Sequence, residues 1–485
     1  MEVGLALLLV GAVLAAGVVA ALGATRTGLP VLVAFLTLGM LLGSDGPGGI
    51  AFDNAELARR IGIVGLAAIL YEGGLSTSWR RLREVALPAA MLSTVGVVVT
   101  ALLTGVAARL LMHLGWAESI LLGSVVASTD AAAVFATLRF SNLRRRLART
   151  LEAESGGNDP MAIALTVGLI AWIEKPAYGL GDLVLLVVRQ IGLGLVFGVA
   201  LGAVATWVFA HIPRSIGSFA PVASVAAAAI AYGLTDVAGG SGFLAVYAVG
   251  LAVGSTPSRY RRGLVAFHQG LAFIAQVALF VVLGLLVFPR QLPHVALAAL
   301  GLTALLVFVV RPVAVYASTF LADFSVKERG LLGWAGLRGA VPIVLATFVL
   351  SSRVGSAATI FNTVFFVVLV STILQGTTLD RLSRRLGLES PAPLLQSAPL
   401  AVDSEWSQLE LVDFPVAADH AIAGSVVREL GLPRDALVAV VARGKSAIPP
   451  RGSTRIDPGD RLFVLVPREK RADLEDVFAR WRQRV

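Results

Sequence analysis

Long apolar runs separated by short polar stretches dominate the chain up to residue 376. A helix needs roughly 20 mostly apolar residues to cross the hydrocarbon core of a bilayer, and runs of about this length recur throughout this region. The pattern predicts about thirteen transmembrane helices, at 3–22, 29–43, 58–75, 86–112, 116–138, 150–173, 183–210, 218–235, 241–256, 265–288, 293–320, 330–350 and 355–376.

Positive residues concentrate in alternate connections between these runs. Arginines cluster at 80–83, 139–149 and 259–262, whereas the connections at 44–56 and 288–294 hold few. Cytoplasmic loops of membrane proteins carry the excess of Lys and Arg. We therefore expect a multi-pass protein of the cell inner membrane, with its N-terminus outside and its C-terminus in the cytoplasm.

The composition changes after residue 376. We expect a transmembrane domain at 1–376, a linker at 377–402 with a basic and then a proline-rich part, and a small cytoplasmic α/β domain at 403–485. About 80 residues make a small core, so this domain is expected to dimerise. It is predicted to hold strands at 409–412, 437–442 and 462–466, helices at 422–430 and 470–481, and a turn at 457–460.

The composition excludes several classes of protein. The chain is 56% hydrophobic and 15% charged, with a net charge of +9, whereas soluble domains are about 25% charged. Its arginines lie between apolar runs, which argues against a nucleic-acid partner. There are no cysteines, the five histidines show no ligand spacing, and no glycine-rich phosphate motif is present. We expect no cofactor and no enzymatic activity.

Two of the predicted spans carry polar or flexible residues where a continuous helix would be apolar. Ser128-Thr129-Asp130 falls within 116–138, and Gly336, Arg338, Gly339 and Pro342 fall within 330–350. Both helices should therefore be broken in mid-membrane. They lie seven spans apart, so they run in opposite directions. This predicts inverted repeats, spans 1–6 against 8–13, with a midplane site where the broken helices cross.

Ionisable residues inside a span are costly and mark candidate functional sites. They are Glu72, Asp130, Glu152, Glu154, Asp159, Arg311 and Arg338. We expect Asp130 and Arg338 to neutralise the ends of the broken helices. Glu154 is expected to form a structural ion pair with Arg338, because a lone buried charge is too costly. Arg311 is expected to snorkel or to cap a helix.

Asp159 follows Asn158 and precedes Pro160, whose ring opens the preceding helical turn. Ser155 lies one turn earlier on the same face, and Thr129 could reach from span 116–138. Carboxylate, hydroxyl, amide and carbonyl oxygens around one charge suit a hard monovalent cation. The additional carboxylates typical of a calcium site are missing.

Such a site couples a cation to protons without further residues. A carboxylate in a cavity that excludes water holds either a proton or the cation, and one carboxylate implies one-for-one exchange. The sequence thus predicts a cation/proton antiporter. Two alternatives are a potassium pathway gated like a channel, for which no TVGYG-type filter is present, and a sensor derived from a transporter.

The motifs resemble those of the monovalent cation:proton antiporter superfamily, in its electroneutral sodium- or potassium-proton branch. The resemblance covers about 5–376 and rests on the segments 128–130, 154–160 and 336–340. It implies a thirteen-helix homodimer that works like an elevator. It also implies that Asp159 binds the ion, that Asn158 marks the electroneutral branch, that Thr129, Asp130 and Ser155 belong to the site, and that Glu154 bridges to Arg338.

The C-terminal domain is similar to TrkA-C (RCK-C) regulatory domains of potassium-transport systems. The resemblance rests on the segments 431–433, 448–452 and 458–462. It implies a domain that dimerises and binds a small regulatory ligand, in some cases cyclic di-AMP. It also favours potassium over sodium as the transported cation.

Overall fold

The computed structural model divides the chain into two compact units, Met1–Glu389 and Ser390–Val485. It describes residues 3–27, 30–130, 133–134, 143–175, 177–213, 219–258, 260–389, 397–398, 409–444, 446–467 and 470–482. Part of the predicted arginine cluster at 139–149, together with Arg259 and most of the proline-rich part of the linker, lies outside the described residues.

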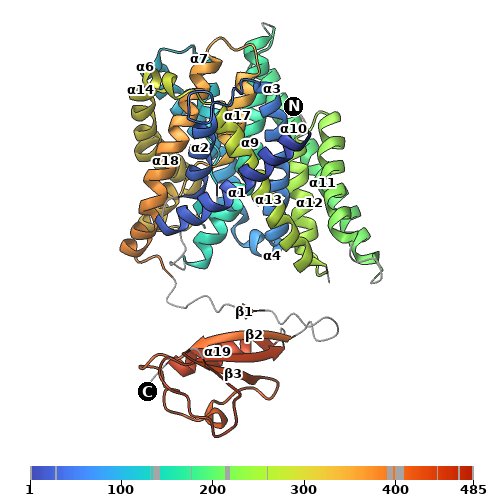
Figure 1. Ribbon diagram of the computed structural model, residues 1–485, viewed down its shortest axis with the longest axis vertical. Coiled ribbons are helices and arrows are strands. Elements are labelled where there is room, and N and C mark those ends of the chain that lie inside the picture. Colours follow the sequence, from blue (N-terminus) through green and yellow to red (C-terminus); the bar gives the residue numbers. More distant parts are fainter. Residues whose placement is uncertain are drawn as a thin grey trace. The chain divides into compact units, whose positions relative to one another are not determined.

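The first unit is a bundle of helices (Figure 1). Within the described residues, seven helical stretches are long and apolar enough to cross a membrane. The helical membrane fold is confirmed, whereas the number thirteen stays a prediction. The helices are α1 (Val3–Thr27), α2 (Val31–Leu42), α3 (Ala55–Ser76), α4 (Trp79–Leu82), α5 (Ala86–Met91), α6 (Val97–Met112), α7 (Trp116–Val125), α9 (Arg145–Glu174), α10 (Leu180–His211), α11 (Ala220–Val237), α12 (Gly242–Ser255), α13 (Arg261–Leu285), α14 (Leu292–Leu305), α15 (Arg311–Thr319), α16 (Val326–Trp334), α17 (Ala340–Leu350) and α18 (Ala357–Leu386).

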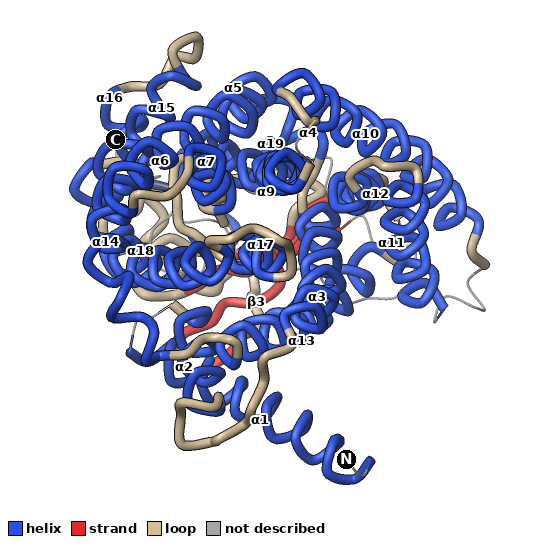
Figure 2. The backbone as a smooth tube through the Cα atoms, turned by 90° about the horizontal axis from the view of Figure 1, so that it is seen from above, coloured by secondary structure: helices blue, strands red, loops and turns tan. Residues whose placement is uncertain are grey.

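Both spans predicted to be broken are interrupted. Helix α7 ends at Val125, and the chain is not helical again before Asp130. Helix α16 ends at Trp334, and α17 begins at Ala340. Seen from above, α17 lies near the middle of the bundle, where it packs against α3, α7, α9 and α18 (Figure 2).

Two further spans contain a widened helical turn that the sequence pattern did not predict. Residues η2 (Leu92–Gly96) and η5 (Leu306–Val310) each form a π-turn, between α5 and α6 and between α14 and α15. Pro312 accounts for the second one. It has no N–H to donate to the carbonyl of Phe308, four residues earlier, so the regular ladder cannot pass through this turn.

Glycines bring two pairs of helices into backbone contact. A Cβ atom at Gly74 of α3 would overlap the backbone of α12, and one at Gly250 of α12 would overlap that of α3. Likewise, a Cβ atom at Gly39 of α2 would overlap the backbone of α13, and one at Gly284 of α13 would overlap that of α2. Close packing of this kind is typical of glycine-rich membrane helices. Helices α3 and α12 therefore form one tightly packed pair.

Helix α18 continues to Leu386, well into the region predicted as linker, and ends at Gly387 in the left-handed conformation (φ 66°). The next residues return to the start of α9. The backbone N–H of Arg144 donates to the carbonyl of Leu388 (3.0 Å), and Leu143 forms an antiparallel bridge with Glu389. The last residues of the first unit are thus hydrogen-bonded immediately before α9.

The second unit is an antiparallel sheet with strand order β1-β2-β5-β3-β4. Its core includes Phe414, Val464, Phe478 and Trp481. The three predicted strands are present, and the two short strands β1 and β4 were not predicted. The strands are β1 (Ser397–Ala398), β2 (Leu409–Pro415), β3 (Leu437–Arg443), β4 (Ser446–Ile448) and β5 (Arg461–Pro467), and the final helix is α19 (Arg471–Arg482).

The helix predicted at 422–430 is wrong. Only the short turn η7 (Val427–Glu429) is helical there. Gly424 adopts a left-handed conformation (φ 95°), which ends any helix. Val426 then forms an antiparallel bridge with Arg455. The apolar spacing of this segment reflects core contacts of a loop.

The predicted turn at 457–460 is fixed by a buried carboxylate. Both oxygens of Asp460 accept hydrogen bonds from the Arg443 guanidinium at 2.8 Å, and the Asp457 N–H donates to Asp460 Oδ2 at 2.8 Å. The Arg443 guanidinium holds the pKa of Asp460 below its usual range. The turn is thereby joined to the end of β3.

Candidate functional site

Asp159 lies on α9 in the interior of the first unit. Its side chain is only 7% exposed, and no hydrogen-bond donor among the described residues reaches Oδ1. The helix runs through Pro160 without interruption. Pro160 supplies no N–H for the carbonyl of Gly156. The opening of the preceding helical turn that the sequence predicted is therefore limited to one missing hydrogen bond in a continuous helix.

Asn158 reaches the break after α7. Its Nδ2 donates to Thr129 Oγ1 at 2.6 Å, and both side chains are buried. Asn158 Oδ1 and Ser128 Oγ are also buried without a hydrogen-bond partner among the described residues. Ser155 lies one turn before Asp159 and is half-buried. Buried polar oxygens are normally satisfied, so Asn158 Oδ1, Ser128 Oγ and Asp159 Oδ1 have capacity for a bound cation or proton.

Asp130 joins the two helix breaks. Its backbone N–H donates to the carbonyl of Leu337 (2.8 Å), and its Oδ1 accepts from the N–H of Ala133 (3.1 Å). A Cβ atom at Gly339 would overlap its carboxylate, so this carboxylate lies at the residue that precedes α17. A negative charge there stabilises the positive end of the helix dipole. The arrangement fits the neutralising role predicted for Asp130.

Arg338, in the break between α16 and α17, contacts the break after α7. Its guanidinium is buried and donates to the carbonyl of Ser128 at 3.0 Å, while its own carbonyl accepts from Thr372 Oγ1 at 2.9 Å. Ser128 follows the C-terminal end of α7, where unpaired carbonyls carry partial negative charge. Arg338 is therefore placed where a helix-end cation is favourable.

The predicted partner of Glu154 is wrong. Glu154 forms a buried ion pair with Arg311, at 2.6 Å between Oε1 and Nη2, with side chains 1% and 3% exposed. Arg311 does not snorkel, but it does cap a helix as expected, because its Nη2 also donates to the carbonyl of Leu332 in the last turn of α16 at 3.4 Å. The reason is packing, because α9 and α15 both contact η2 and so bring the two side chains together, whereas Arg338 is engaged at Ser128. The signal available in the sequence was a second charge, Arg311, inside an apolar span.

Glu72 and Glu152, the other acidic residues predicted to lie inside spans, also accept side-chain hydrogen bonds. Glu72 accepts a hydrogen bond from Ser76 on the same helix at 2.7 Å. Glu152 accepts one from Thr77 at 3.0 Å, which connects α9 to the end of α3. The sequence predicted neither contact.

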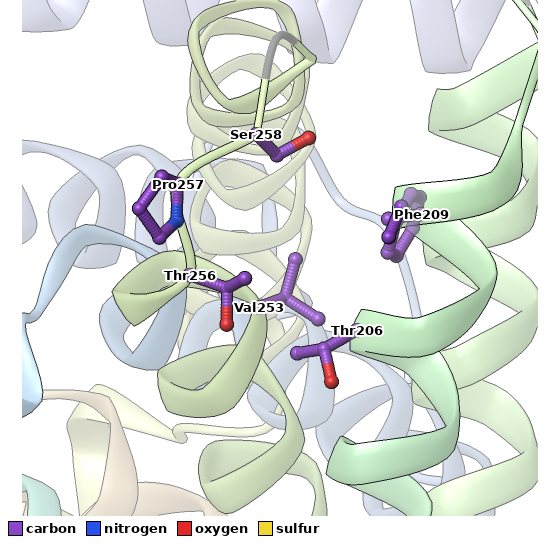
Figure 3. Close-up of a pocket in the computed structure, with 7 residues that line it drawn as sticks. Thr206, Phe209, Val253, Thr256, Pro257 and Ser258 are labelled. Carbon is purple, nitrogen blue, oxygen red and sulfur yellow. The ribbon is translucent and has the colours of Figure 1, made fainter.

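A separate pocket of about 310 Å³ opens between the ends of α10 and α12 (Figure 3). Its lining contains hydroxyl and apolar side chains and no ionisable group: Thr206, Phe209, Ala210, Val253, Thr256, Pro257 and Ser258. None of the predicted site residues borders it.

Comparisons with known proteins agree with this arrangement. The family described as sodium/hydrogen exchanger, transmembrane, matches residues 11–385, and the TrkA-C domain matches residues 411–479. The structure is similar to that of the sodium proton antiporter MjNhaP1 from Methanocaldococcus jannaschii at pH 8, with a TM-score of 0.71 and 24% identity over 80% of this chain and 99% of the other. This likeness supports the fold.

Curated relatives extend over almost the whole chain. A K(+)/H(+) antiporter NhaP2 of Shewanella sp. (strain ANA-3) and a K(+)/H(+) antiporter NhaP of Alkalimonas amylolytica are each 36% identical, over 97% and 98% of this chain and 83% of their own length. A Na(+)/H(+) antiporter ApNhaP of Aphanothece halophytica is 27% identical over 70% of this chain and 68% of its own. The chain is therefore a multi-pass membrane protein that belongs to the transmembrane sodium/hydrogen exchanger family of cation/proton antiporters and carries a TrkA-C domain.

Proposed function

We propose that the protein exchanges potassium for protons, one for one, with Asp159 as the residue that binds either ion. The observation that carries this proposal is a buried carboxylate with an unpartnered oxygen beside the Asn158–Thr129 hydrogen bond. The potassium preference is supported by the two 36%-identical relatives named K(+)/H(+) antiporters and by the TrkA-C match.

The site residues have two kinds of proposed role: one supplies the charge, and the others supply or position neutral ligands. Asp159 supplies the one negative charge that a proton or a cation neutralises. Ser155, Thr129 and Asn158 supply neutral oxygen ligands or hold them in place, and Asp130 joins the break that carries Thr129 to the break before α17. Arg338 and the Glu154–Arg311 ion pair keep the surrounding helix ends and charges balanced. An empty, charged Asp159 would be costly to move through an apolar interior, so only loaded states cross.

Alternating access then requires α9 to move relative to the closely packed pair α3–α12, in the manner of an elevator. We further propose that the protein acts as a homodimer in the cell inner membrane, with its N-terminus outside and its C-terminus in the cytoplasm. The TrkA-C domain is proposed to regulate exchange by binding a small ligand such as cyclic di-AMP or another nucleotide.

Cation selectivity is tested in everted membrane vesicles or proteoliposomes that carry a preformed pH gradient. Addition of K⁺ is expected to collapse the gradient with a lower half-saturating concentration than addition of Na⁺ or Li⁺, with Rb⁺ close to K⁺. A collapse driven by Na⁺ alone would contradict the potassium assignment. Cation flux without any proton movement would contradict antiport and indicate a channel-like pathway.

Removal of the second unit tests regulation. A chain that ends after Ser390 keeps Glu389 and its bridge to Leu143, so the first unit should fold and exchange should persist. We expect its rate to become insensitive to added nucleotide ligands, including cyclic di-AMP, when initial rates are compared with those of the full chain. Complete loss of exchange in a correctly folded truncated protein would show that the domain is needed for transport itself.

A further inference from the structure

A hydrogen-bonded bridge connects α9 to the α3–α12 pair close to Asp159. Thr77, the residue that follows α3, donates its hydroxyl to Glu152 Oε1 on α9 at 3.0 Å. The hydroxyl of Tyr247, on α12, lies against α9 at Gly156, one turn after Glu152. Thr77 is 4% exposed and Tyr247 is 9% exposed. Three helices therefore meet through side chains that have no role in the proposed ion site.

The hydroxyl of Thr77 has two acceptors within reach, Glu152 Oε1 and the carbonyl of Gly73 at 2.8 Å. It carries one proton. It can donate to only one of them at a time. When it donates to Glu152, it joins the end of α3 to α9.

The bridge covers the face of α9 that leads to Asp159. Glu152, Gly156 and Asp159 are spaced by four and three residues, which places them on one face of the helix. A Cβ atom at Gly156 would overlap the hydroxyl oxygen and ring of Tyr247. Tyr247 thus lies against α9 one turn from Asp159, toward the end of the helix that begins at Arg145.

The two sides of the bridge belong to different packing groups. Helices α3 and α12 are joined backbone to backbone through Gly74, Gly250 and Gly254. Helix α9 packs mainly against α5, α7, α10 and η2. If α9 moves relative to α3–α12, the hydrogen bond between Thr77 and Glu152 must break, whereas the glycine contacts within the pair can stay.

We propose that Glu152, Thr77 and Tyr247 form a gate that closes the approach to Asp159 from the arginine-rich side of the membrane. The gate opens once in each transport cycle. This inference rests on the proposed function, in which Asp159 carries the ion. Loss of one hydrogen bond from the gate should shift its equilibrium toward the open state by about fivefold.

The chain has no cysteine, so a single introduced thiol can report whether the gate is open. Ser155→Cys places that thiol one helical turn from Asp159. In everted vesicles, its rate of modification by a small, charged, membrane-impermeant methanethiosulfonate is measured from the arginine-rich side. Adding Thr77→Val, which removes the hydrogen bond to Glu152, is expected to increase this rate about fivefold.

Matched control variants distinguish loss of the gate from a general loosening of helix packing. Tyr71→Phe removes a buried tyrosine hydroxyl that bonds Ser224 at 2.8 Å, between α3 and α11. This change leaves the contacts of α9 in place, so the modification rate should be unchanged. Thr77→Ser keeps the hydroxyl and should also label at the unmodified rate. Glu152→Ala should accelerate labelling, and Glu152→Gln, which can still hydrogen-bond Thr77, should not.

Equal labelling with and without Thr77→Val would overturn the gate, as would equal acceleration by Tyr71→Phe. Monodispersity and unfolding temperature of each purified variant verify that it is folded. Labelling does not depend on transport. If exchange requires Asp159 but labelling ignores the bridge, only the gate fails. If labelling follows the bridge but exchange survives the loss of Asp159, the proposed function fails.

Discussion

Replacing Asp159 by asparagine is expected to abolish cation-driven proton movement while leaving the protein folded. The amide is similar in size but can neither release a proton nor supply the negative charge that compensates a dehydrated cation. Removing one partner of a buried charge pair costs about 3–5 kcal/mol, so exchange should fall by at least about a hundredfold. The measurement is the collapse of a pH gradient in proteoliposomes on addition of K⁺ or Na⁺.

Asp182→Asn is a suitable control for this experiment. Asp182 is exposed at the start of α10, where its carboxylate accepts from the N–H of Gly179 at 2.9 Å. The same chemical change at this position should leave exchange near the rate of the unmodified protein. Robust exchange by a folded Asp159→Asn protein would refute the assignment of the carrier residue, as would simultaneous binding of a proton and a cation at Asp159.

Glu154→Gln is expected to destabilise the first unit by about 3–5 kcal/mol, because it leaves Arg311 buried without its counter-charge. Arg311→Met should have a comparable effect by leaving Glu154 unpaired. The double variant Glu154→Gln/Arg311→Met removes both charges, so it should recover most of the lost stability. The measurement is the free energy of unfolding of purified protein in a mild detergent, analysed as a double-mutant cycle.

The matched control replaces Arg338, the ion-pair partner of Glu154 that was predicted from the sequence. Glu154→Gln combined with Arg338→Met should be less stable than either single variant, because Arg338 is held by the carbonyl of Ser128. If the Arg338 combination recovers stability and the Arg311 combination does not, the ion pair of the structure is wrong and the pairing predicted from the sequence is correct.

The sequence was sufficient to predict features that depend on local chemistry. An apolar run of a given length specifies a membrane helix, and a Gly–Arg–Gly segment or a Ser-Thr-Asp segment inside such a run specifies a break. Both breaks are present. These predictions need no knowledge of which helices are neighbours.

Features that depend on neighbours could not be predicted in this way. Glu154 had two buried arginines as candidate partners, and the choice was decided by the packing of α9 and α15 against η2. The gate residue Thr77 is a common type of residue after a helix, and only the fold places it beside Glu152. Likewise, the apolar spacing of 422–430 suited a helix, but Gly424 and a bridge to Arg455 make it a loop.

The hydrogen bond between Arg144 and Leu388 places the exit of the membrane unit beside the first turn of α9. The tether to the TrkA-C domain is thus fastened to the base of the helix that bears Asp159, two residues before it begins. A pull on Glu389 would therefore act directly on the residues that precede α9, through the bridge to Leu143 and the hydrogen bond between Leu388 and Arg144.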